Sequence, residues 1–388
     1  MKILLALTYY RPHVSGLTIY VERLARALAN RGHHVSVLTS QYEPDLPRQE
    51  IDHGVHIVRV PVALRVSKGV IMPTIGLEAT RQVRAHDVLS LHLPQLDAAG
   101  IALRGRLFRR PTLLTYHCDL RLPRGPVHAA ANVVVNLANR AAALFAHGVV
   151  AYTQDYAIHS PFLSKYMRKL HVIPPPVEVH RADNQELADF VRRHRRLQGP
   201  AIGMAARLAT EKGVEYLLQA LPRILERQPA AEVLFVGQHE NVLGEAEYAR
   251  KLAPLLERFR DHWSFLGVLD PRQMGAFYRA CDVTVLPSVN ATESFGLVQI
   301  ESMMCGTPVV ASNLPGVRQP VLTTGMGRIV PLRNPEALGK AILEVLEDRS
   351  SFSGDEHAIG ERYTPDRTAE HYEELFAELL DRLRSGKP

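Results

Sequence analysis

The chain has 388 residues, of which 46% are hydrophobic and 22% charged, as in ordinary soluble globular proteins. This length exceeds what one hydrophobic core usually organises and predicts two domains, while no apolar run reaches the ~18–20 residues needed to span a bilayer. Lys and Arg outnumber Asp and Glu by 21 to 11 in residues 1–180, whereas residues 181–388 hold 25 against 29. The basic first half suits an anionic partner, such as a phosphorylated acceptor, an acidic lipid surface or nucleic acid.

Cysteine usage and the N-terminus indicate the compartment. The three cysteines, Cys118, Cys281 and Cys305, are odd in number and widely spaced, which fits neither a disulfide framework nor a zinc site. We therefore expect a reducing cytoplasm. The apolar start of the chain is short and lacks a small-residue cleavage site, so it predicts a first strand rather than a secretory signal.

The first half alternates strands and helices. Strands are expected at residues 2–8, 34–40, 55–60, 88–91, 112–116, 148–152 and 171–173, and helices at 17–31, near 94–107 and at 129–146. Gly16 opens the first helix and would let a ligand approach its backbone and the helix N-terminus. The dinucleotide fingerprint G-x-G-x-x-G is absent, which disfavours a dehydrogenase. His117 follows a strand at its carboxyl end, where open α/β sheets bind ligands, although a structural role stays open.

Three consecutive prolines, Pro174 to Pro176, interrupt this alternation, and we place a domain boundary after residue 174. The alternation then restarts. Strands are expected at residues 201–206, 232–236, 263–266, 282–286 and 309–312, and helices at 214–227, near 245–260, at 271–280, from 297, at 335–348 and after Pro365. The fold class is therefore α/β, with two doubly wound domains whose carboxyl strand ends face a central cleft.

Two acids frame the start of a short helix in the second half. Glu293 precedes a helix expected to begin near Leu297, and Glu301 lies four residues inside it. The first N–H groups of a helix lack intrahelical acceptors and attract phosphate. The carboxylates would then flank a bound anion and accept hydrogen bonds from hydroxyls on either side, as a sugar-diphosphate-ribose requires. Two solvated surface glutamates are the alternative.

A basic pair precedes another helix of this half. Arg207 and Lys212 share one loop at a strand's carboxyl end and combine a fork-shaped donor with a point charge, which suits a diphosphate, although exposed surface charge is the alternative. No Asp-x-Asp follows a strand and no His/Cys cluster has ligand spacing, so we predict a metal-independent site without a cofactor. A serine-hydrolase elbow, G-x-S-x-G, is also absent.

These motifs resemble those of retaining glycosyltransferases of family 4, which have the GT-B fold. The run Glu-Ser-Phe-Gly-Leu…Glu-Ser-Met-Met-Cys-Gly-Thr-Pro-Val-Val from Glu293 resembles the family's E-x7-E signature, and Ala-Ala-Arg…Glu-Lys-Gly around Arg207 resembles its basic donor loop. Similarity extends over nearly the whole chain. It implies an acceptor-side domain at residues 1–174, a nucleotide-sugar-binding domain at 175–362, and a terminal helix at 363–388 that returns to the first domain.

The resemblance also implies residue roles. Arg207 and Lys212 would hold the donor diphosphate and stabilise the leaving group. Glu301 would bind the ribose, Glu293 the sugar hydroxyls, and the backbone at Val268 the base. Three consecutive residues would complete the phosphate site with their backbone: Phe295, Gly296 and Leu297.

In the first domain, His117 would lie beside the donor sugar and act in catalysis. Gly16 would lie near the diphosphate and the acceptor. The family commonly has two glycines there, whereas this chain has Gly16 followed by Leu17.

The implied reaction is transfer of a hexosyl group from a UDP- or GDP-sugar to a lipid, glycan or small-molecule acceptor, with retention of anomeric configuration. A front-face route is favoured over double displacement, because no carboxylate nucleophile is evident. The alternatives are a GT-B-fold sugar-nucleotide epimerase or phosphorylase and a non-catalytic sugar-nucleotide binder.

We expect no nucleic-acid partner. Peripheral attachment to the inner face of the membrane is a hypothesis that rests on the basic first half and on the run RGRLFRR at residues 104–110. A solvated helix end is the alternative reading of this run.

Overall fold

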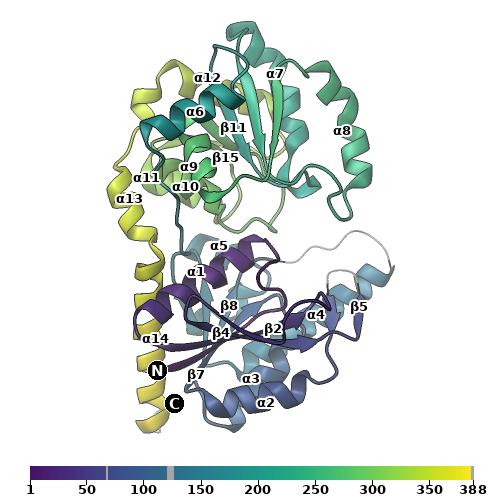
Figure 1. The fold of residues 1–388 in the computed structure, drawn as a ribbon, viewed down its shortest axis with the longest axis vertical. Coiled ribbons are helices and arrows are strands. Elements are labelled where there is room, and N and C mark those ends of the chain that lie inside the picture. Colours follow the sequence, from purple (N-terminus) through teal and green to yellow (C-terminus); the bar gives the residue numbers. More distant parts are fainter. Residues whose placement is uncertain (67–68, 120–125, 386–388) are drawn as a thin grey trace. The chain divides into compact units, whose positions relative to one another are not determined.

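A computed structural model describes residues 1–66, 69–119 and 126–385. The chain forms two compact units (Figure 1). Unit 1 comprises residues 1–176 together with 363–388, and unit 2 comprises residues 177–362. The first unit is therefore discontinuous in sequence, because the end of the chain folds with its beginning.

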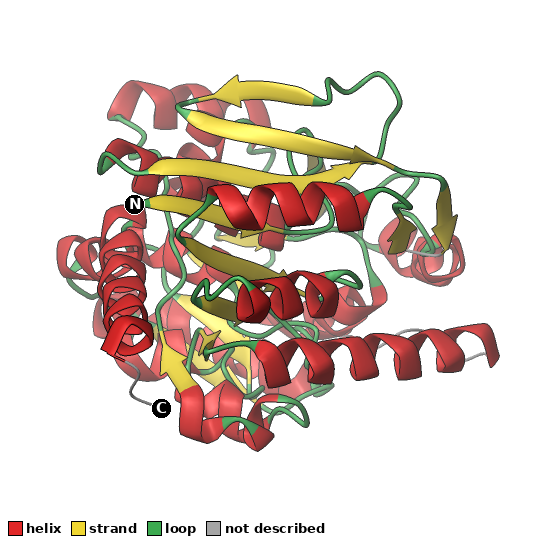
Figure 2. Ribbon diagram, turned by 90° about the horizontal axis from the view of Figure 1, so that it is seen from below, coloured by secondary structure: helices red, strands yellow, loops and turns green. Residues whose placement is uncertain are grey.

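Unit 1 is built on a twisted, mainly parallel sheet (Figure 2). Its described strands are β1 (Lys2–Ala6), β2 (His34–Gln41), β3 (Gln49–Asp52), β4 (Val55–Pro61), β7 (Val88–Leu93), β8 (Thr112–Tyr116), β9 (Gly148–Ala151) and β10 (Leu170–Val172). Their order is β10-β9-β8-β7-β1-β2-β4-β3, and only β3 runs antiparallel to its neighbour. A separate hairpin pairs β5 (Leu64–Val66) with β6 (Gly69–Ile71). Because β1 lies between β2 and β7, the strand order reverses there, and the carboxyl ends of β1 and β7 form the ligand-binding edge expected of such sheets.

Helices follow most strands of unit 1. They are α1 (Gly16–Asn30), α2 (Ile75–Ala85), α3 (Ala98–Leu107), α4 (Pro126–Phe145) and α5 (Gln154–His159), with short 3₁₀ turns η1 (Leu163–Lys165) and η2 (Met167–Lys169). Helix α1 illustrates why these residues form helices. Ser15 caps it by accepting a hydrogen bond from the Thr18 N–H, and its buried face carries Leu24 and Leu28 at helical spacing. Gly32 follows its end at a φ of +85°, which glycine adopts readily.

The terminal helix α14 (Pro365–Ser385) packs against α1 in unit 1. Tyr372 and Phe376 on its inner face are fully buried. The Tyr372 hydroxyl lies 2.9 Å from the Tyr20 hydroxyl and 2.6 Å from Thr115 Oγ1. Two hydrogen bonds from Arg31 to the Glu373 carboxylate, of 2.8 and 2.7 Å, hold its outer face.

Unit 2 contains a fully parallel sheet of six described strands. They are β11 (Ala201–Ala205), β12 (Glu232–Val236), β13 (Trp263–Gly267), β14 (Val283–Leu286), β15 (Val309–Ser312) and β16 (Gly327–Val330). The order is β13-β12-β11-β14-β15-β16, which is the Rossmann order with its switch point between β11 and β14. Trp263, Phe235 and Phe265 pack together in or beside the core of this unit.

The described helices of unit 2 cover both faces of this sheet. They are α6 (Asn184–His194), α7 (Val214–Arg227), α8 (Ala246–Arg258), α9 (Pro271–Ala280), α10 (Leu297–Met304), α11 (Gln319–Thr324), α12 (Pro335–Glu347) and α13 (Glu356–Tyr363), with 3₁₀ turns η3 (Thr210–Lys212) and η4 (Arg349–Phe352). The predicted bounds of α7 and α9 and the predicted start of α10 are confirmed. Each of these starts is marked locally, by glycine before α7 and α10 and by Asp270 with Pro271 at α9.

Several short or polar elements were not predicted from the sequence. They are β3, β5, β6, β16, α2, α5, α6, α11 and α13. Helix α6 shows the reason, since Phe190 is its one fully buried residue and the hydrophobic pattern is correspondingly weak. It is held instead by a capping box between Asp183 and Glu186. The helix predicted near residues 94–107 begins only at Ala98, after a loop that contains Pro94.

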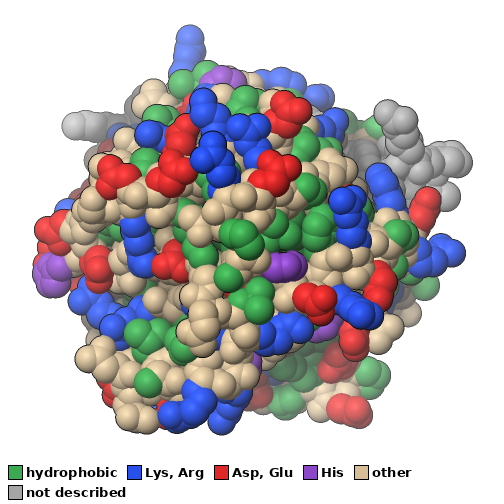
Figure 3. Space-filling view, turned by 90° about the horizontal axis from the view of Figure 1, so that it is seen from above, with side chains coloured by type: hydrophobic (Ala, Val, Ile, Leu, Met, Phe, Trp, Pro, Cys, Tyr) green, Lys and Arg blue, Asp and Glu red, His purple; other side chains and the backbone are tan. Residues whose placement is uncertain are grey.

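Among the described residues, no helix combines the length and apolarity needed to cross a membrane. Figure 3 shows basic and acidic side chains intermixed over one face of the molecule.

Candidate active site

Two loops of unit 2 leave the sheet at its switch point. Residues 206–213 follow β11, and residues 287–296 follow β14. Three contacts join them. Gly213 adopts a φ of +68°, and a Cβ there would lie 2.2 Å from the carbonyl oxygen of Pro287. The Val289 N–H donates to the Glu211 carbonyl at 3.0 Å. The third contact joins two predicted site residues.

Lys212 and Glu293 form this third contact. Lys212 Nζ lies 2.5 Å from Glu293 Oε2, and their side chains are only 21% and 16% exposed. The structure therefore brings together the predicted diphosphate-binding cation and the predicted sugar-binding carboxylate. Arg207 lies on the same loop as Lys212 and is exposed. Its Nη2 donates to Glu211 Oε1 at 3.0 Å, which directs the guanidinium along the loop.

The second loop ends at the N-terminus of α10. Gly296 precedes the helix at a φ of +79°, and no side chain caps this helix end. A Cβ at Gly296 would approach Leu286 Cδ2 to 2.3 Å, so both backbone conformation and space favour glycine. Phe295 is buried, and therefore only its backbone is available to a ligand. Leu297 is the first residue of the helix, and the helix dipole places positive potential at this end.

Glu301 lies one turn inside α10 and is half-buried. Its Oε2 accepts a hydrogen bond of 2.9 Å from the Tyr278 hydroxyl on α9. Tyr278 was not among the predicted site residues. It lies 23 positions before Glu301 in the sequence, and only the packing of α9 on α10 brings the two together.

Val268 lies at the carboxyl end of β13, two strands from β11. It is 75% exposed and follows Gly267, whose φ is +71°. Neighbouring strands are about 5 Å apart, so this position is on the order of 10 Å across the sheet from the start of the Arg207 loop. An extended ligand along the carboxyl edge would reach both.

The predicted residues of unit 1 lie at the carboxyl edge of its sheet. Gly16 is exposed at the start of α1, and no atom lies within 4 Å of where a Cβ would be. Its φ is not positive, so the backbone does not require glycine here. Space for a close ligand approach is what the residue provides.

His117 follows β8 and is only 5% exposed. Its Nε2 lies 3.0 Å from Nδ1 of His92 on β7, and its Nδ1 is hydrogen-bonded to the Tyr152 hydroxyl. Burial, with a smaller contribution from His92, holds the pKa of His117 well below the ordinary value. His117 is therefore neutral, and sequence reasoning missed its partners in the candidate site, His92 and Tyr152.

No group of three or more His, Cys, Asp or Glu side chains is placed to hold a metal ion within the part of the chain that the structure describes.

Two known protein families match this sequence. Residues 188–362 match the family described as "Glycosyl transferases group 1", and residues 15–176 match "Glycosyl transferase 4-like domain". The chain is a glycosyltransferase that combines a glycosyl transferase 4-like domain with a glycosyl transferases group 1 domain. The two matches together span most of this glycosyltransferase, and the family expected from its motifs is confirmed.

Two relatives align with almost the whole glycosyltransferase. The D-inositol 3-phosphate glycosyltransferase of Xylanimonas cellulosilytica is 28% identical over 404 residues, which cover 95% of this chain and 92% of the relative. The GDP-mannose-dependent alpha-(1-6)-phosphatidylinositol monomannoside mannosyltransferase of Mycobacterium tuberculosis is 26% identical, with 99% and 98% coverage.

Solved structures show the same fold. Anabaena Alr3699/HepE in complex with UDP has a TM-score of 0.75 at 19% identity, covering 97% of this glycosyltransferase and 100% of that chain. Sucrose-phosphate synthase from Thermosynechococcus elongatus has a TM-score of 0.76 at 21% identity, with 98% and 99% coverage. The expected GT-B fold, with two Rossmann-like domains, is confirmed.

Proposed function

We propose that this glycosyltransferase transfers a hexosyl group from a nucleotide diphosphate sugar to an acceptor hydroxyl, with retention at the anomeric carbon and without a metal ion. The observation that carries the proposal is the 2.5 Å contact between Lys212 Nζ and Glu293 Oε2 at the switch point of unit 2. It joins a cation and a carboxylate from two loops that share the sheet edge used for ligands.

Each member of this pair has a separate task when a donor binds. The donor diphosphate draws the Lys212 ammonium toward its oxygens, beside the Arg207 guanidinium and the N-terminus of α10. Glu293 is then free to accept hydrogen bonds from the sugar hydroxyls. Glu301, oriented by Tyr278, accepts hydrogen bonds from the ribose, while the Val268 backbone meets the base.

The chemical step is the exchange of two bonds at the anomeric carbon. The bond to the diphosphate oxygen breaks while the acceptor oxygen attacks from the same face, and the departing phosphate oxygen takes the acceptor proton. Negative charge grows on the diphosphate, where Arg207, Lys212 and the first amides of α10 stabilise it. His117 is neutral and therefore contributes no charge at the sugar, and both of its ring nitrogens are engaged, so a hydrogen bond to the sugar requires it to exchange its contact with His92 or Tyr152.

The names of the relatives indicate the acceptor class. Those relatives are named for inositol 3-phosphate and for phosphatidylinositol glycosides, so a cyclitol that carries a phosphate, free or lipid-linked, is the acceptor we propose. The excess of Lys and Arg in residues 1–180 supports a phosphate-bearing partner. Gly16 leaves the space in unit 1 for its approach.

A donor-binding panel tests the donor site. UDP-, GDP- and ADP-sugars are added to the purified chain, and the ligand that binds raises the unfolding temperature. Arg207→Ala and Lys212→Ala should each lower turnover by on the order of 10²–10³-fold, and Glu301→Ala should weaken donor binding. Lys340→Ala, at an exposed lysine of α12, is the matched control. Unchanged donor binding in both Arg207→Ala and Glu301→Ala would show that the site is assigned wrongly.

Product analysis tests the reaction. Retention predicts an anomeric configuration identical to that of the donor, read by proton NMR of the product. Activity should persist in excess chelator, and loss of activity that added magnesium restores would exclude the metal-independent mechanism. Donor incubated without acceptor should stay essentially unconverted, whereas epimer formation would identify an epimerase instead.

A further inference from the structure

Helix α4 has a composition unlike that of a solvent-exposed helix. It spans Pro126–Phe145, carries one charged residue, Arg140, and contains no acid. Surface helices normally present charged and polar residues to water. Helix α4 is therefore unusually apolar for a helix with an exposed face.

A row of aliphatic side chains lies on this outer face. Val133, Leu137 and Leu144 are 59%, 57% and 70% exposed, and Arg140 is exposed between them. Spacings of three and four residues place all four on one side of the helix, along about 16 Å. Single exposed leucines are common, but an aligned row is typical of a surface that meets another apolar phase.

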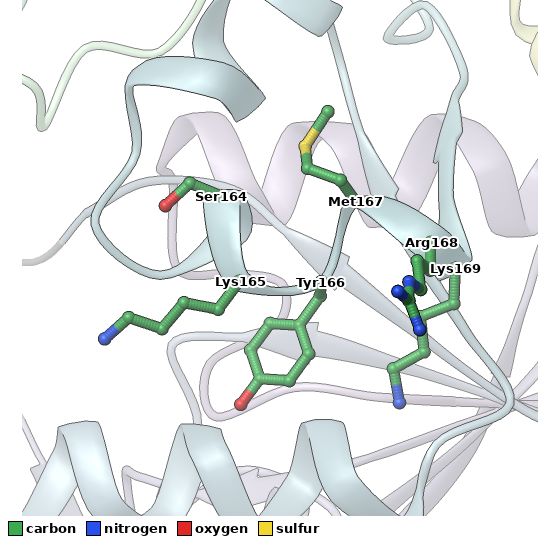
Figure 4. A pocket seen from close by; sticks show the side chains of 6 residues that line it. All are labelled: Ser164, Lys165, Tyr166, Met167, Arg168 and Lys169. Carbon is green, nitrogen blue, oxygen red and sulfur yellow. The ribbon is translucent and has the colours of Figure 1, made fainter.

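The turns η1 and η2 add cations beside this face. Lys169 Nζ donates to the carbonyls of Ala143 and Ala146 at the end of α4, which anchors the segment there. Burial raises the pKa of Tyr166, and the nearby charge of Arg140 opposes this shift. Figure 4 shows Lys165 and Tyr166 pointing to the same side of this segment, away from Met167.

Three cations on and beside α4 lack acidic partners among the residues that the structure describes. In the described residues, Arg140, Lys165 and Arg168 are exposed and form no ion pair. Residues 98–170 contain ten Lys and Arg against two acids. Both acids are engaged elsewhere, since Asp119 accepts from Tyr116, Tyr156 and Ser160, and Asp155 lies beside His159. The segment that contains α4, η1 and η2 therefore carries a strong excess of positive charge.

The run at residues 104–110 contributes less than its sequence suggests. Arg104 Nε donates to Thr80 Oγ1 at 2.8 Å, and Arg110 Nη2 donates to the Arg84 carbonyl at 3.1 Å. Two of its four arginines are thus tied to the protein itself.

We propose that the α4 face, comprising Val133, Leu137, Arg140 and Leu144 with Lys165 and Arg168, docks on an anionic lipid bilayer. An apolar row with exposed cations beside it matches the boundary between acyl chains and anionic headgroups, and tyrosine is a residue type common at that boundary. A second copy of this face would bring like charges together, which disfavours a symmetric dimer. The proposal rests on the proposed function only for its purpose, the capture of a lipid-linked acceptor, because docking requires neither donor nor turnover.

Vesicle co-sedimentation of the full chain tests the docking surface. Binding is expected to vesicles of phosphatidylcholine with phosphatidylglycerol, to fall with added salt, and to be weak on phosphatidylcholine alone. The double variant Leu137→Glu/Leu144→Glu should lower the partition coefficient at least about tenfold, and Arg140→Glu/Lys165→Glu should lower it by a similar factor. Leu322→Glu, at a 61% exposed leucine of α11 in unit 2, is the matched control and should bind like the parent.

Two controls keep this test separate from the proposed function. Donor-induced thermal stabilisation and transfer to a water-soluble acceptor should be unchanged in the α4 variants, which shows that they fold and work. Equal vesicle binding by parent and α4 variants, or absence of binding to anionic vesicles, would overturn the proposal. Concentration-dependent dimerisation that Leu137→Glu/Leu144→Glu abolishes would assign the face to a second copy instead.

Discussion

At the scale of single residues, two buried histidines of unit 1 have pKa values that folding lowers strongly. Ser90 Oγ, His92 and His117 form a row that ends at the Tyr152 hydroxyl. Burial lowers the pKa of His92 to about 3 and holds the pKa of His117 lower than that of a free imidazole. Each ring then offers one N–H and one lone pair, so the tautomer of one fixes that of the other.

This neutral pair predicts acid sensitivity of unit 1. The unfolded chain protonates both histidines near their ordinary pKa of about 6.5, whereas the folded chain does not. Their contribution to stability is therefore complete above about pH 6.5 and is lost as the pH falls below it. Each histidine lowers the unfolding free energy by about 1.4 kcal/mol per pH unit in that range. Urea unfolding followed by circular dichroism at several pH values should show the decline.

The variant His92→Gln/His117→Gln isolates the contribution of this pair. Other histidines with lowered pKa, such as His147, remain in it and supply a residual slope. We expect a shallower dependence of unfolding free energy on pH than in the parent. A slope identical to that of the parent would contradict neutral burial of the pair.

At the scale of elements, the loops that carry Lys212 and Glu293 are held against each other. The close approach of Gly213 to the Pro287 carbonyl fixes the Lys212 loop against the loop that carries Glu293. Backbone contact, rather than side-chain packing alone, sets the geometry of the proposed clamp.

Gly213→Ala should therefore destabilise unit 2 and weaken donor binding together. The left-handed backbone costs an alanine about 1 kcal/mol, and displacement of the Pro287 carbonyl raises the total to on the order of 2–4 kcal/mol. Gly325→Ala is the matched control, because Gly325 has a similar φ of +72° with no atom within 4 Å of a Cβ. Chemical denaturation of both variants should separate steric displacement from backbone strain, and equal losses would refute the role of the contact.

Sequence patterns predicted what is local and missed what depends on packing. The starts of α7, α9 and α10 carry glycine or an aspartate cap, so their positions were readable. Four site residues were predicted because they lie after a strand or near the start of a helix, where local sequence signals are clear: Arg207, Lys212, Glu293 and Glu301. Their roles in donor binding stay predictions until variants are measured.

The side chains that contact the predicted site residues could not be predicted from the sequence. Tyr278 meets Glu301 because α9 packs on α10. His92 contacts His117 because β7 and β8 are neighbours in the sheet, and the strand order could not be predicted from the sequence. The same holds for secondary structure: helix α6 is mostly polar, so its hydrophobic residues do not show a clear helical periodicity.

At the scale of the whole molecule, unit 1 depends on the last helix of the chain. Synthesis of residues 1–176 leaves the unit without α14, whose Tyr372 and Phe376 complete its core. The core of unit 1 is therefore complete only when α14 is in place, and the stability of the unit is coupled to a segment that follows unit 2 in the sequence.

Tyr372→Phe probes this coupling. The change removes the hydroxyl that is hydrogen-bonded to the Tyr20 hydroxyl and to Thr115 Oγ1. Loss of these two hydrogen bonds should lower the unfolding free energy by about 1–3 kcal/mol. Calorimetry should show the transition of unit 1 at lower temperature, while the transition that donor ligand stabilises stays in place. Tyr216→Phe, at a half-buried tyrosine of α7, is the comparison and should move neither transition strongly. A shift of both transitions by Tyr372→Phe would mean that the units unfold as one.

The chain contains a single tryptophan, Trp263, at the start of β13 in unit 2. Its indole is 5% exposed and lies 5.9 Å from the ring of Phe265, which in turn stacks on His239 at 4.4 Å. Intrinsic tryptophan emission therefore reports on unit 2 alone, and unit 1 melts without an indole signal. The same emission originates in β13, which Val268 directly follows, so quenching on nucleotide addition would register occupancy of the carboxyl end of that strand without any label.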